Sequence, residues 1–194
     1  MKLAIINYGA GNIFSVKSAF ERLGIEPIIT ADPVEIESSD LVVFPGVGHA
    51  ASAMQQLKES QLDRLIPNLK QPVLGICLGM QLMCESSEEG DTKGLSIFDK
   101  VKVQRFDDRL KVPHMGWNEL TNSKGLLAEI VDPVYFVHSY YAPLSQYTIA
   151  ETNYPFGFSA ALQKDNFIAC QFHPEKSGAV GEIILRKFLK TNKM

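Results

Sequence analysis

The sequence is poor in cysteine and lacks a long hydrophobic run. Its 194 residues include 3 cysteines, an odd number, and no two of them form a Cys-x-x-Cys pair. A fully paired disulfide framework and the usual zinc-ligand spacing are therefore both excluded. The apolar residues 3–6 end at Asn7, far short of a signal-peptide core or a membrane span. We expect a cytoplasmic protein in a reducing compartment.

An excess of charge of one sign is also lacking. The chain has 19 Lys and Arg against 22 Asp and Glu, a net charge of −3. This balance argues against a nucleic-acid-binding protein that works through a basic stripe. A chain of this length corresponds to about one domain and buries roughly 70% of its unfolded surface, enough for a core without disulfides. We predict a single domain over residues 1–194, with limited room for a second active site.

The first half alternates apolar strands with helical periodicity. Strands are predicted at residues 3–6, 27–30, 41–44 and 73–76. After the first strand, Ile13, Val16 and Phe20 are spaced as one helix face, with Asn12 as its N-cap and Gly24 beyond its C-terminus. Continuously apolar strands alternating with helices predict a parallel sheet covered on both faces.

The second half has shorter strands, divided by proline, glycine and asparagine. They are predicted at residues 101–103, 135–138, 147–151, 159–163 and 167–172, and a last helix at 180–189. The connections are too short for crossover helices, so antiparallel pairing is expected. The sequence thus predicts an α/β fold with a mostly parallel central sheet, flanking helices and an antiparallel extension in the second half.

Cys77 stands between glycines at a predicted strand-to-helix turn, in Gly75-Ile76-Cys77-Leu78-Gly79. This corresponds to a nucleophile elbow with sulfur in place of oxygen. Such a turn exposes the side chain above the carboxyl end of the sheet, and the helix N-terminus favours a thiolate and offers N–H groups to an oxyanion. Most free cysteines are small buried hydrophobes, so Cys77 alone leaves both interpretations open.

A base for such a nucleophile is found in Gln171-Phe172-His173-Pro174-Glu175. His173 ends an apolar strand, where open α/β sheets commonly carry functional groups. Pro174 favours an extended backbone at His173, and residues two apart in an extended segment project to the same side, so Glu175 is expected to face the same region. A carboxylate there orients the imidazole while the other ring nitrogen takes the thiol proton. A strand-end histidine with a solvated neighbour is the ordinary alternative, but the elbow and this segment together favour a Cys-His-Glu triad.

Two glycine-containing loops are candidate anion sites. Residues 45–48, Pro-Gly-Val-Gly, follow the third predicted strand and can direct backbone N–H groups at an oxyanion, or form only a tight turn. Residues 9–11 lack both the G-x-G-x-x-G pattern and a P-loop lysine, so a phosphate site is not expected there.

The other cysteines and three of the four histidines carry weaker signals. Cys84, predicted on the same helix face as the candidate nucleophile, and Cys170, in an apolar strand, are interpreted as core residues. His49 is predicted to be a solvated loop residue. Hydrophobic periodicity explains neither His114 nor His138, so neither receives a role from this reasoning.

Together these segments resemble the class I glutamine amidotransferase family. The matching motifs are residues 75–79 extended by Met80-Gln81-Leu82, the loop 45–48 and His173-Pro174-Glu175, in the family's order and across nearly the whole chain. The resemblance implies a flavodoxin-like fold and hydrolysis of the side-chain amide of glutamine, with release of ammonia and no metal or organic cofactor.

The family's residue roles can be carried over onto the matching positions. The resemblance implies that Cys77 is the nucleophile, His173 the acid and base, and Glu175 the residue that orients His173. It also implies that the backbone N–H groups of Val47 and Leu78 form the oxyanion hole. The positions that match those holding the glutamine are Gly48, Gln81, Ser139 and Tyr140.

Within the family, four segments are most similar to glutaminase subunits of imidazole glycerol phosphate synthases: residues 7–12, 113–118, 135–140 and 173–178. The sequence departs from that group at Asn7, where an acidic residue is common. The resemblance implies a heterodimer with a (β/α)8 synthase (cyclase) subunit of histidine biosynthesis, which receives ammonia through an internal passage. That subunit makes imidazole glycerol phosphate and aminoimidazole carboxamide ribonucleotide. The residues that match the partner face or ammonia gate are Met115, Trp117, Asn118, Tyr135 and Lys176.

Three alternatives stay open. A glutaminase of the same fold could serve surface-sugar amidation or pyridoxal phosphate synthesis, although segments 113–118 and 135–140 argue against the second. A non-catalytic binding module is disfavoured because all three triad residues are present. A cysteine peptidase or small-molecule hydrolase is disfavoured by Met80-Gln81 and the loop 45–48. The motifs already occupy the chain as a glutaminase, so a separate partner is expected to hold the acceptor site.

Overall fold

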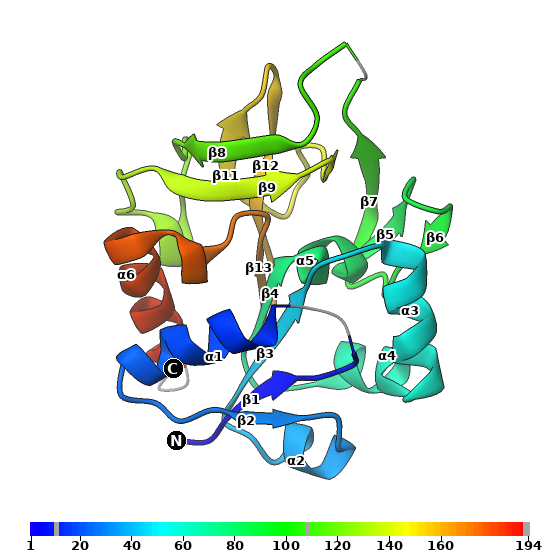
Figure 1. Cartoon of the computed structure of the whole chain (residues 1–194), viewed down its shortest axis with the longest axis vertical. Helices are drawn as coiled ribbons and strands as arrows, with labels where there is room; N and C mark the ends of the chain where they lie inside the picture. Colours follow the sequence, from blue (N-terminus) through cyan, green and yellow to red (C-terminus); the bar gives the residue numbers. More distant parts are fainter. Residues whose placement is uncertain (10–11, 108, 192–194) are drawn as a thin grey trace.

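The computed structural model describes residues 1–9, 12–107 and 109–191, and its centre is a seven-stranded sheet (Figure 1). The order is β11-β12-β13-β4-β3-β1-β2. The strands are β1 (Leu3–Ile6), β2 (Ile28–Thr30), β3 (Leu41–Gly46), β4 (Val73–Cys77), β11 (Thr148–Asn153), β12 (Gly157–Lys164) and β13 (Phe167–Cys170). The run β2-β1-β3-β4-β13 is parallel, in the flavodoxin-like order, and β12 and β11 extend it in antiparallel fashion. The predicted sheet is therefore confirmed.

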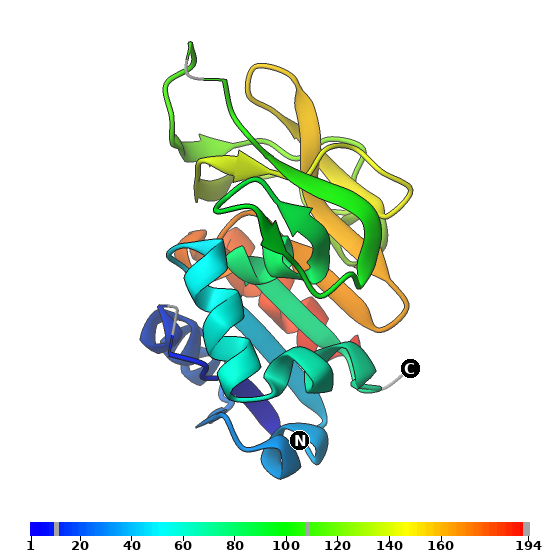
Figure 2. The ribbon, with the colours of Figure 1, turned by 90° about the vertical axis from the view of Figure 1, so that its right-hand side faces the viewer.

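Helices cover both faces of this sheet (Figures 1 and 2). They are α1 (Ile13–Arg22), α2 (Pro33–Glu37), α3 (Ala50–Glu59), α4 (Leu62–Leu65), α5 (Leu78–Met83) and α6 (Gly178–Leu189), with short 3-10 helices η1 (Ile66–Asn68), η2 (Gly125–Leu127) and η3 (Pro174–Lys176). Helices α1 and α6 share one apolar core, and α2 to α5 share a second. Successive residues of β3 alternate between these cores, Val43 in the first and Val42 and Phe44 in the second. Burial on both faces explains why these strands are continuously apolar.

Two smaller sheets, which the sequence did not predict as separate units, lie beyond the carboxyl ends of the parallel strands. One has the order β10-β7-β5-β6 and the other pairs β8 with β9. Their strands are β5 (Cys84–Ser87), β6 (Thr92–Lys93), β7 (Phe98–Arg105), β8 (His114–Asn118), β9 (Val134–His138) and β10 (Tyr140–Tyr141). The carbonyl of Val137 in β9 contacts the sulfur of Cys77 at the end of β4, at 3.9 Å. The second half of the chain thus closes over the sheet edge where the candidate nucleophile lies.

Two local predictions were wrong. Cys84 does not continue the helix after the elbow, because the returning chain at Leu95 and Ser96 donates to the carbonyls of Leu82 and Cys84, and Cys84 begins β5 instead. Both cysteines outside the elbow are nevertheless buried, as expected. The loop predicted at 45–48 begins two residues later, because its first two residues continue the ladder of β3 with β4.

Within the part of the chain that the structure describes, no helix is both long enough and apolar enough to cross a membrane.

Candidate active site

Cys77 occupies a strained turn between β4 and α5. Its φ is 54° and its ψ is −110°, a conformation that L-residues adopt only where their surroundings impose it. Gly79 makes the turn possible: a Cβ at this position would lie 2.0 Å from the carbonyl oxygen of Phe44. Likewise, a Cβ at Gly75 would lie 2.8 Å from the sulfur of Met83. The two glycines therefore permit close packing of α5 on the sheet, as the elbow pattern predicts.

His173 and Glu175 form a buried pair. The Nδ1 atom of His173 lies 2.7 Å from Oε1 of Glu175, and the two side chains are 2% and 1% exposed. His173 has the predicted extended backbone, with φ −104° and ψ 95°. Glu175, however, lies in the 3-10 turn η3 rather than in an extended segment. The turn therefore brings the carboxylate to the ring. Glu175 faces His173 as predicted, but the predicted extended segment between them was wrong.

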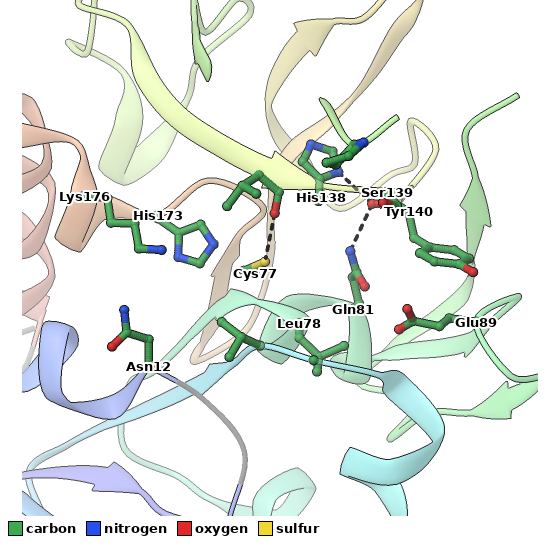
Figure 3. Close-up of a pocket in the computed structure, with 14 residues that line it drawn as sticks. Asn12, Cys77, Leu78, Gln81, Glu89, His138, Ser139, Tyr140, His173 and Lys176 are labelled. Atoms are coloured by element: carbon green, nitrogen blue, oxygen red, sulfur yellow. Dashed lines mark hydrogen bonds between the residues drawn. The ribbon is translucent and has the colours of Figure 1, made fainter. Parts of the chain in front are cut away.

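The other ring nitrogen of His173 is directed toward Cys77. Since the carboxylate of Glu175 accepts from Nδ1, the Nε2 atom is left for the candidate nucleophile, and it has no other hydrogen-bond partner among the described residues. Burial lowers the pKa of His173, but interactions with Cys77 and Glu175 outweigh burial and raise that pKa to about 9. Figure 3 shows the imidazole beside the sulfur. The three predicted triad residues are thus brought together.

A cavity of about 520 Å³ opens beside this triad (Figure 3). It is lined by both residues predicted for the oxyanion hole and by all four predicted to hold glutamine: Val47, Leu78, Gly48, Gln81, Ser139 and Tyr140. Nε2 of Gln81 donates to the carbonyl of Tyr140 at 3.0 Å and to Oε1 of Gln171 at 2.9 Å. The amide oxygen of Gln81 is therefore the atom that remains for a ligand.

The loop that follows β3 is held at both of its ends. Tyr8, buried below it, donates its hydroxyl to the carbonyl of Pro45 at 3.1 Å. Beyond this anchor Val47 and Gly48 are exposed, and the φ of Gly48 is +104°. His49, exposed as predicted, then caps α3 through Nδ1, which accepts from the N–H of Ala51. The segment is thus held by Tyr8 before it and by the start of α3 after it, with the exposed residues Val47 and Gly48 between them at the cavity.

Three residues that sequence reasoning did not assign also border the site. Glu89 is the one carboxylate among the described cavity residues, and no local pattern distinguished it. Asn12 lies at the N-cap position of α1, but it makes no side-chain cap and faces the cavity instead (Figure 3). Ala10 and Gly11, which precede it in the resemblance segment, lie outside the described residues. Gln171 contacts the candidate nucleophile itself, with Nε2 3.7 Å from the Cys77 sulfur.

The five residues predicted for a partner face are found in different places. Met115 and Trp117 on β8 are 61% and 58% exposed, and the ring of Tyr135 on β9 packs 5.9 Å from that of Trp117. Asn118 is directed inward, where its Nδ2 donates to the carbonyl of Asn153 at 2.9 Å. Lys176 lines the cavity on the same side as His173 (Figure 3).

His114 and His138 form a second buried histidine cluster. His114 Nδ1 lies 3.0 Å from His138 Nε2, and His138 Nδ1 lies 2.7 Å from the carbonyl of Tyr140. Burial lowers the pKa of His114 to about 4 and that of His138 to about 3. Both rings are therefore neutral near pH 7, and they support the backbone of the cavity wall.

Comparisons with known proteins point to one family. Residues 4–191 match the family model described as glutamine amidotransferase class-I. A curated relative from Bacteroides thetaiotaomicron, imidazole glycerol phosphate synthase subunit HisH, is 57% identical and covers 97% of the chain and 99% of its own length. The protein of that name from Yersinia pseudotuberculosis is 46% identical, with 98% of the chain and 100% of the relative covered. A solved structure described as a glutamine amidotransferase has the same fold, with a TM-score of 0.75 at 17% identity over 98% of this chain and 99% of the other. The chain therefore belongs to the class I glutamine amidotransferase family.

Proposed function

We propose that this protein is the glutaminase subunit of an imidazole glycerol phosphate synthase. It hydrolyses L-glutamine to glutamate and ammonia and passes the ammonia to a synthase subunit in histidine biosynthesis. The relatives named HisH, 46% and 57% identical over nearly the whole chain, support this acceptor over the other two that the sequence left open. The observation that carries the glutaminase activity is the cysteine beside a histidine whose far nitrogen is held by a buried carboxylate.

In the first half-reaction, Cys77 attacks the side-chain amide carbon of glutamine. Because the pKa of His173 is raised to about 9, its Nε2 already carries the proton that Cys77 gives up, and Glu175 holds the ring in place. The sulfur electron pair then forms the new S–C bond. The backbone N–H groups of Val47 and Leu78 stabilise the oxyanion that develops. His173 then protonates the amide nitrogen, so that the C–N bond breaks and ammonia departs. A γ-glutamyl thioester remains on Cys77.

In the second half-reaction, His173 works as a base. Water loses a proton to Nε2 and attacks the thioester, which releases glutamate and restores Cys77. The raised pKa of His173, about 9, suits the acid role in the first step. Acylation of Cys77 removes the contribution of one of the two residues that raise this pKa, so the neutral ring can take the proton from water.

The charges around the cavity suit an amino acid. In Figure 3, Asn12, His173 and Lys176 lie toward one end of the cavity and Glu89 toward the other, with Cys77 between them. The Glu89 carboxylate is the complement of the α-ammonium group of glutamine. The amide oxygen of Gln81, with the Gly48, Ser139 and Tyr140 segment, contacts the rest of the substrate.

The partner docks on the face of β8 and β9, as a (β/α)8 synthase subunit in a heterodimer. Exposed Met115 and Trp117 give this face the apolar and aromatic character of an interface core. The same strand pair touches the triad from inside, because the carbonyl of Tyr135 accepts from the N–H of His173 at 2.9 Å. We therefore expect slow hydrolysis by the isolated chain and faster hydrolysis when the partner and its ligand bind, with Lys176 and Tyr135 at the ammonia exit.

The cytoplasm is the proposed location of this complex. Cys77, Cys84 and Cys170 are all free thiols in the structure, in keeping with a reducing compartment.

A C77A variant, compared with C84A as a control for loss of a cysteine outside the cavity, tests this function. Both chains are mixed with the purified synthase subunit, and glutamate and imidazole glycerol phosphate are measured. We expect C77A to lose glutamine-dependent turnover by about 10⁴-fold while added ammonium still supports synthesis, because only the ammonia source is lost. Glutamine-dependent turnover that survives in C77A contradicts the mechanism. A synthase subunit that gains no activity from the wild-type chain contradicts the proposed pathway.

A further inference from the structure

The nucleophile has a neighbour that the triad does not include. Gln171 follows β13 directly, two residues before His173, and it is fully buried. Its backbone N–H donates to the carbonyl of Ala160 at 2.8 Å, which fixes the residue beside the sheet. A buried amide side chain is costly unless its polar atoms are bonded. Both side-chain polar atoms of Gln171 are bonded, and one of the two partners is the Cys77 sulfur.

The direction of these hydrogen bonds follows from a single backbone carbonyl. The Tyr140 oxygen can only accept, so the atom of Gln81 that bonds to it at 3.0 Å must be the NH₂ group. That same NH₂ group lies 2.9 Å from the Gln171 side chain, whose facing atom must therefore be the oxygen. The NH₂ group of Gln171 is consequently the one that faces Cys77, at 3.7 Å.

The Tyr140 carbonyl is itself held in place by His138, whose Nδ1 donates to it at 2.7 Å. The lowered pKa of His138 keeps that ring neutral, so Nε2 is an acceptor and receives the Nδ1 hydrogen of His114. The amide of Asn118 lies 3.3 Å from the remaining nitrogen of His114. A directed series of buried hydrogen bonds thus fixes Tyr140, Gln81 and Gln171 in turn.

The two polar contacts of the sulfur respond in opposite ways when the thiol ionises. The carbonyl of Val137, at 3.9 Å, accepts from the S–H group and repels a thiolate. The N–H of Gln171 is a donor, so its bond to sulfur strengthens when the S–H proton leaves for His173 and the electron pair stays on sulfur. A fixed donor of this kind stabilises the charged nucleophile without reorganisation.

We propose that Gln171 is a further catalytic residue of this site, whose side-chain N–H donates to the Cys77 sulfur and stabilises the attacking thiolate in an orientation set by Gln81. The proposal deepens the proposed function, since it rests on Cys77 being the nucleophile.

Two variants of Gln171 distinguish the effect of its hydrogen-bond donor from the effect of its side-chain size. Q171M keeps a similar length and volume without a donor, and Q171E replaces the donor by an oxygen while the second carboxylate oxygen still accepts from Gln81. The matched control is Q71E, which makes the same chemical change at a half-buried glutamine that donates to the carbonyl of Ile36. The full-length chains are treated with iodoacetamide at fixed pH, and the alkylated cysteine is identified by mass spectrometry.

We expect Cys77 to be alkylated roughly tenfold more slowly in Q171M than in the wild type, and still more slowly in Q171E, the size expected for a hydrogen bond to a charged atom. Q71E reacts at the wild-type rate. In the presence of the synthase subunit, kcat for glutamine falls by a similar factor while KM stays within about threefold, because the lost bond acts on the nucleophile and not on bound substrate. An alkylation rate in Q171M within twofold of the wild type overturns the proposal.

The alkylation assay also keeps the two hypotheses apart. It requires only a reactive Cys77, so it remains informative if the chain proves to have no glutaminase activity. If the buried carboxylate of Q171E prevents folding, Q171M carries the test, since methionine introduces no charge. Alkylation of Cys84 or Cys170, both buried in the native chain, identifies any variant that has lost its fold.

Discussion

Two regions of the molecule contain buried histidine side chains, and the pKa values of these side chains are shifted in opposite directions. At the carboxyl end of the central sheet, the pKa of His173 is raised to about 9, and in the interior of the β8–β9 pair the pKa values of His114 and His138 are lowered to about 4 and 3. All three side chains are almost completely buried. Burial alone therefore does not decide the charge of a histidine in this protein.

The difference lies in the partner that each ring meets. His173 faces the sulfur of Cys77 and the carboxylate of Glu175. The rings of the other pair face each other, an asparagine amide and a backbone carbonyl. Neutral partners do not offset the desolvation of an imidazolium, whereas the interactions with Cys77 and with the Glu175 carboxylate at 2.7 Å together do. The first environment suits proton transfer, and the second suits a fixed support for the cavity wall.

The largest change in the pKa of His173 is expected when its carboxylate partner is replaced by a neutral one. In E175Q we expect the pKa of His173 to fall by about 1–3 units from its value near 9, because one of the interactions that raise it is lost. We also expect kcat for glutamine to fall by about 10³-fold or more, because the ring is no longer oriented by a carboxylate. NMR titration and the pH–rate profile measure the two effects.

E129Q is a suitable control for E175Q, because Glu129 is an exposed carboxylate paired with Lys187 at 3.2 Å. It leaves both quantities unchanged. An unchanged His173 pKa in folded E175Q would show that Glu175 does not set the charge of the ring.

The comparison also predicts how stability depends on pH. The folded pKa of His173 lies above the ordinary 6.5, so its stabilising contribution is complete below pH 6.5 and is lost as the pH rises to about 9. The folded pKa values of His114 and His138 lie below 6.5, so their contribution is complete above pH 6.5 and is lost as the pH falls toward about 3–4. Since one pKa unit corresponds to about 1.4 kcal/mol, urea unfolding should show a decline of about 3 kcal/mol on the alkaline side, which comes from one histidine. The decline on the acid side should be larger, because it comes from two.

Single substitutions test which histidine causes each of the two declines in the free energy of unfolding. H173Q flattens the alkaline side. H114F, which keeps an aromatic ring between Phe136 and Tyr154, reduces the decline on the acid side to the share of His138. Equal slopes in H114F and the wild type below pH 6.5 would refute the role of the histidine pair.

A smaller effect is expected when the neutral histidine pair is given a charged partner. Asn118 lies 3.3 Å from Nε2 of His114, so N118D places a carboxylate where the pair has a neutral amide. We expect the pKa of His114 to rise from about 4 by about 1 unit or more, as NMR titration would show. N153D, a change at a neighbouring strand end whose backbone carbonyl accepts from Asn118, is the control. A His114 pKa that stays near 4 in N118D would mean that desolvation dominates even beside a carboxylate.

Much of the fold and the triad could be predicted because their signals are local. The apolar strands, the helix faces and the glycines around Cys77 each depend on residues close in sequence, and the structure confirms the parallel sheet and the strand-to-helix elbow. The short His173–Glu175 spacing also placed a carboxylate at the ring, although a 3-10 turn and not a strand brings it there. Where a distant segment intervenes, as at Cys84, the local prediction failed.

The local sequence thus predicted which side chains form the candidate triad and which strand end presents them, because turn chemistry and hydrophobic periodicity act over a few residues. Only the tertiary structure decided the surroundings that set their charge and orientation. Val137 and Gln171, which contact the Cys77 sulfur, are 60 and 94 residues away from it in the sequence. Glu89 lies at the cavity because of a small sheet that hydrophobic periodicity did not predict. Such contacts depend on how the second half of the chain closes over the sheet, and no local pattern encodes that closure.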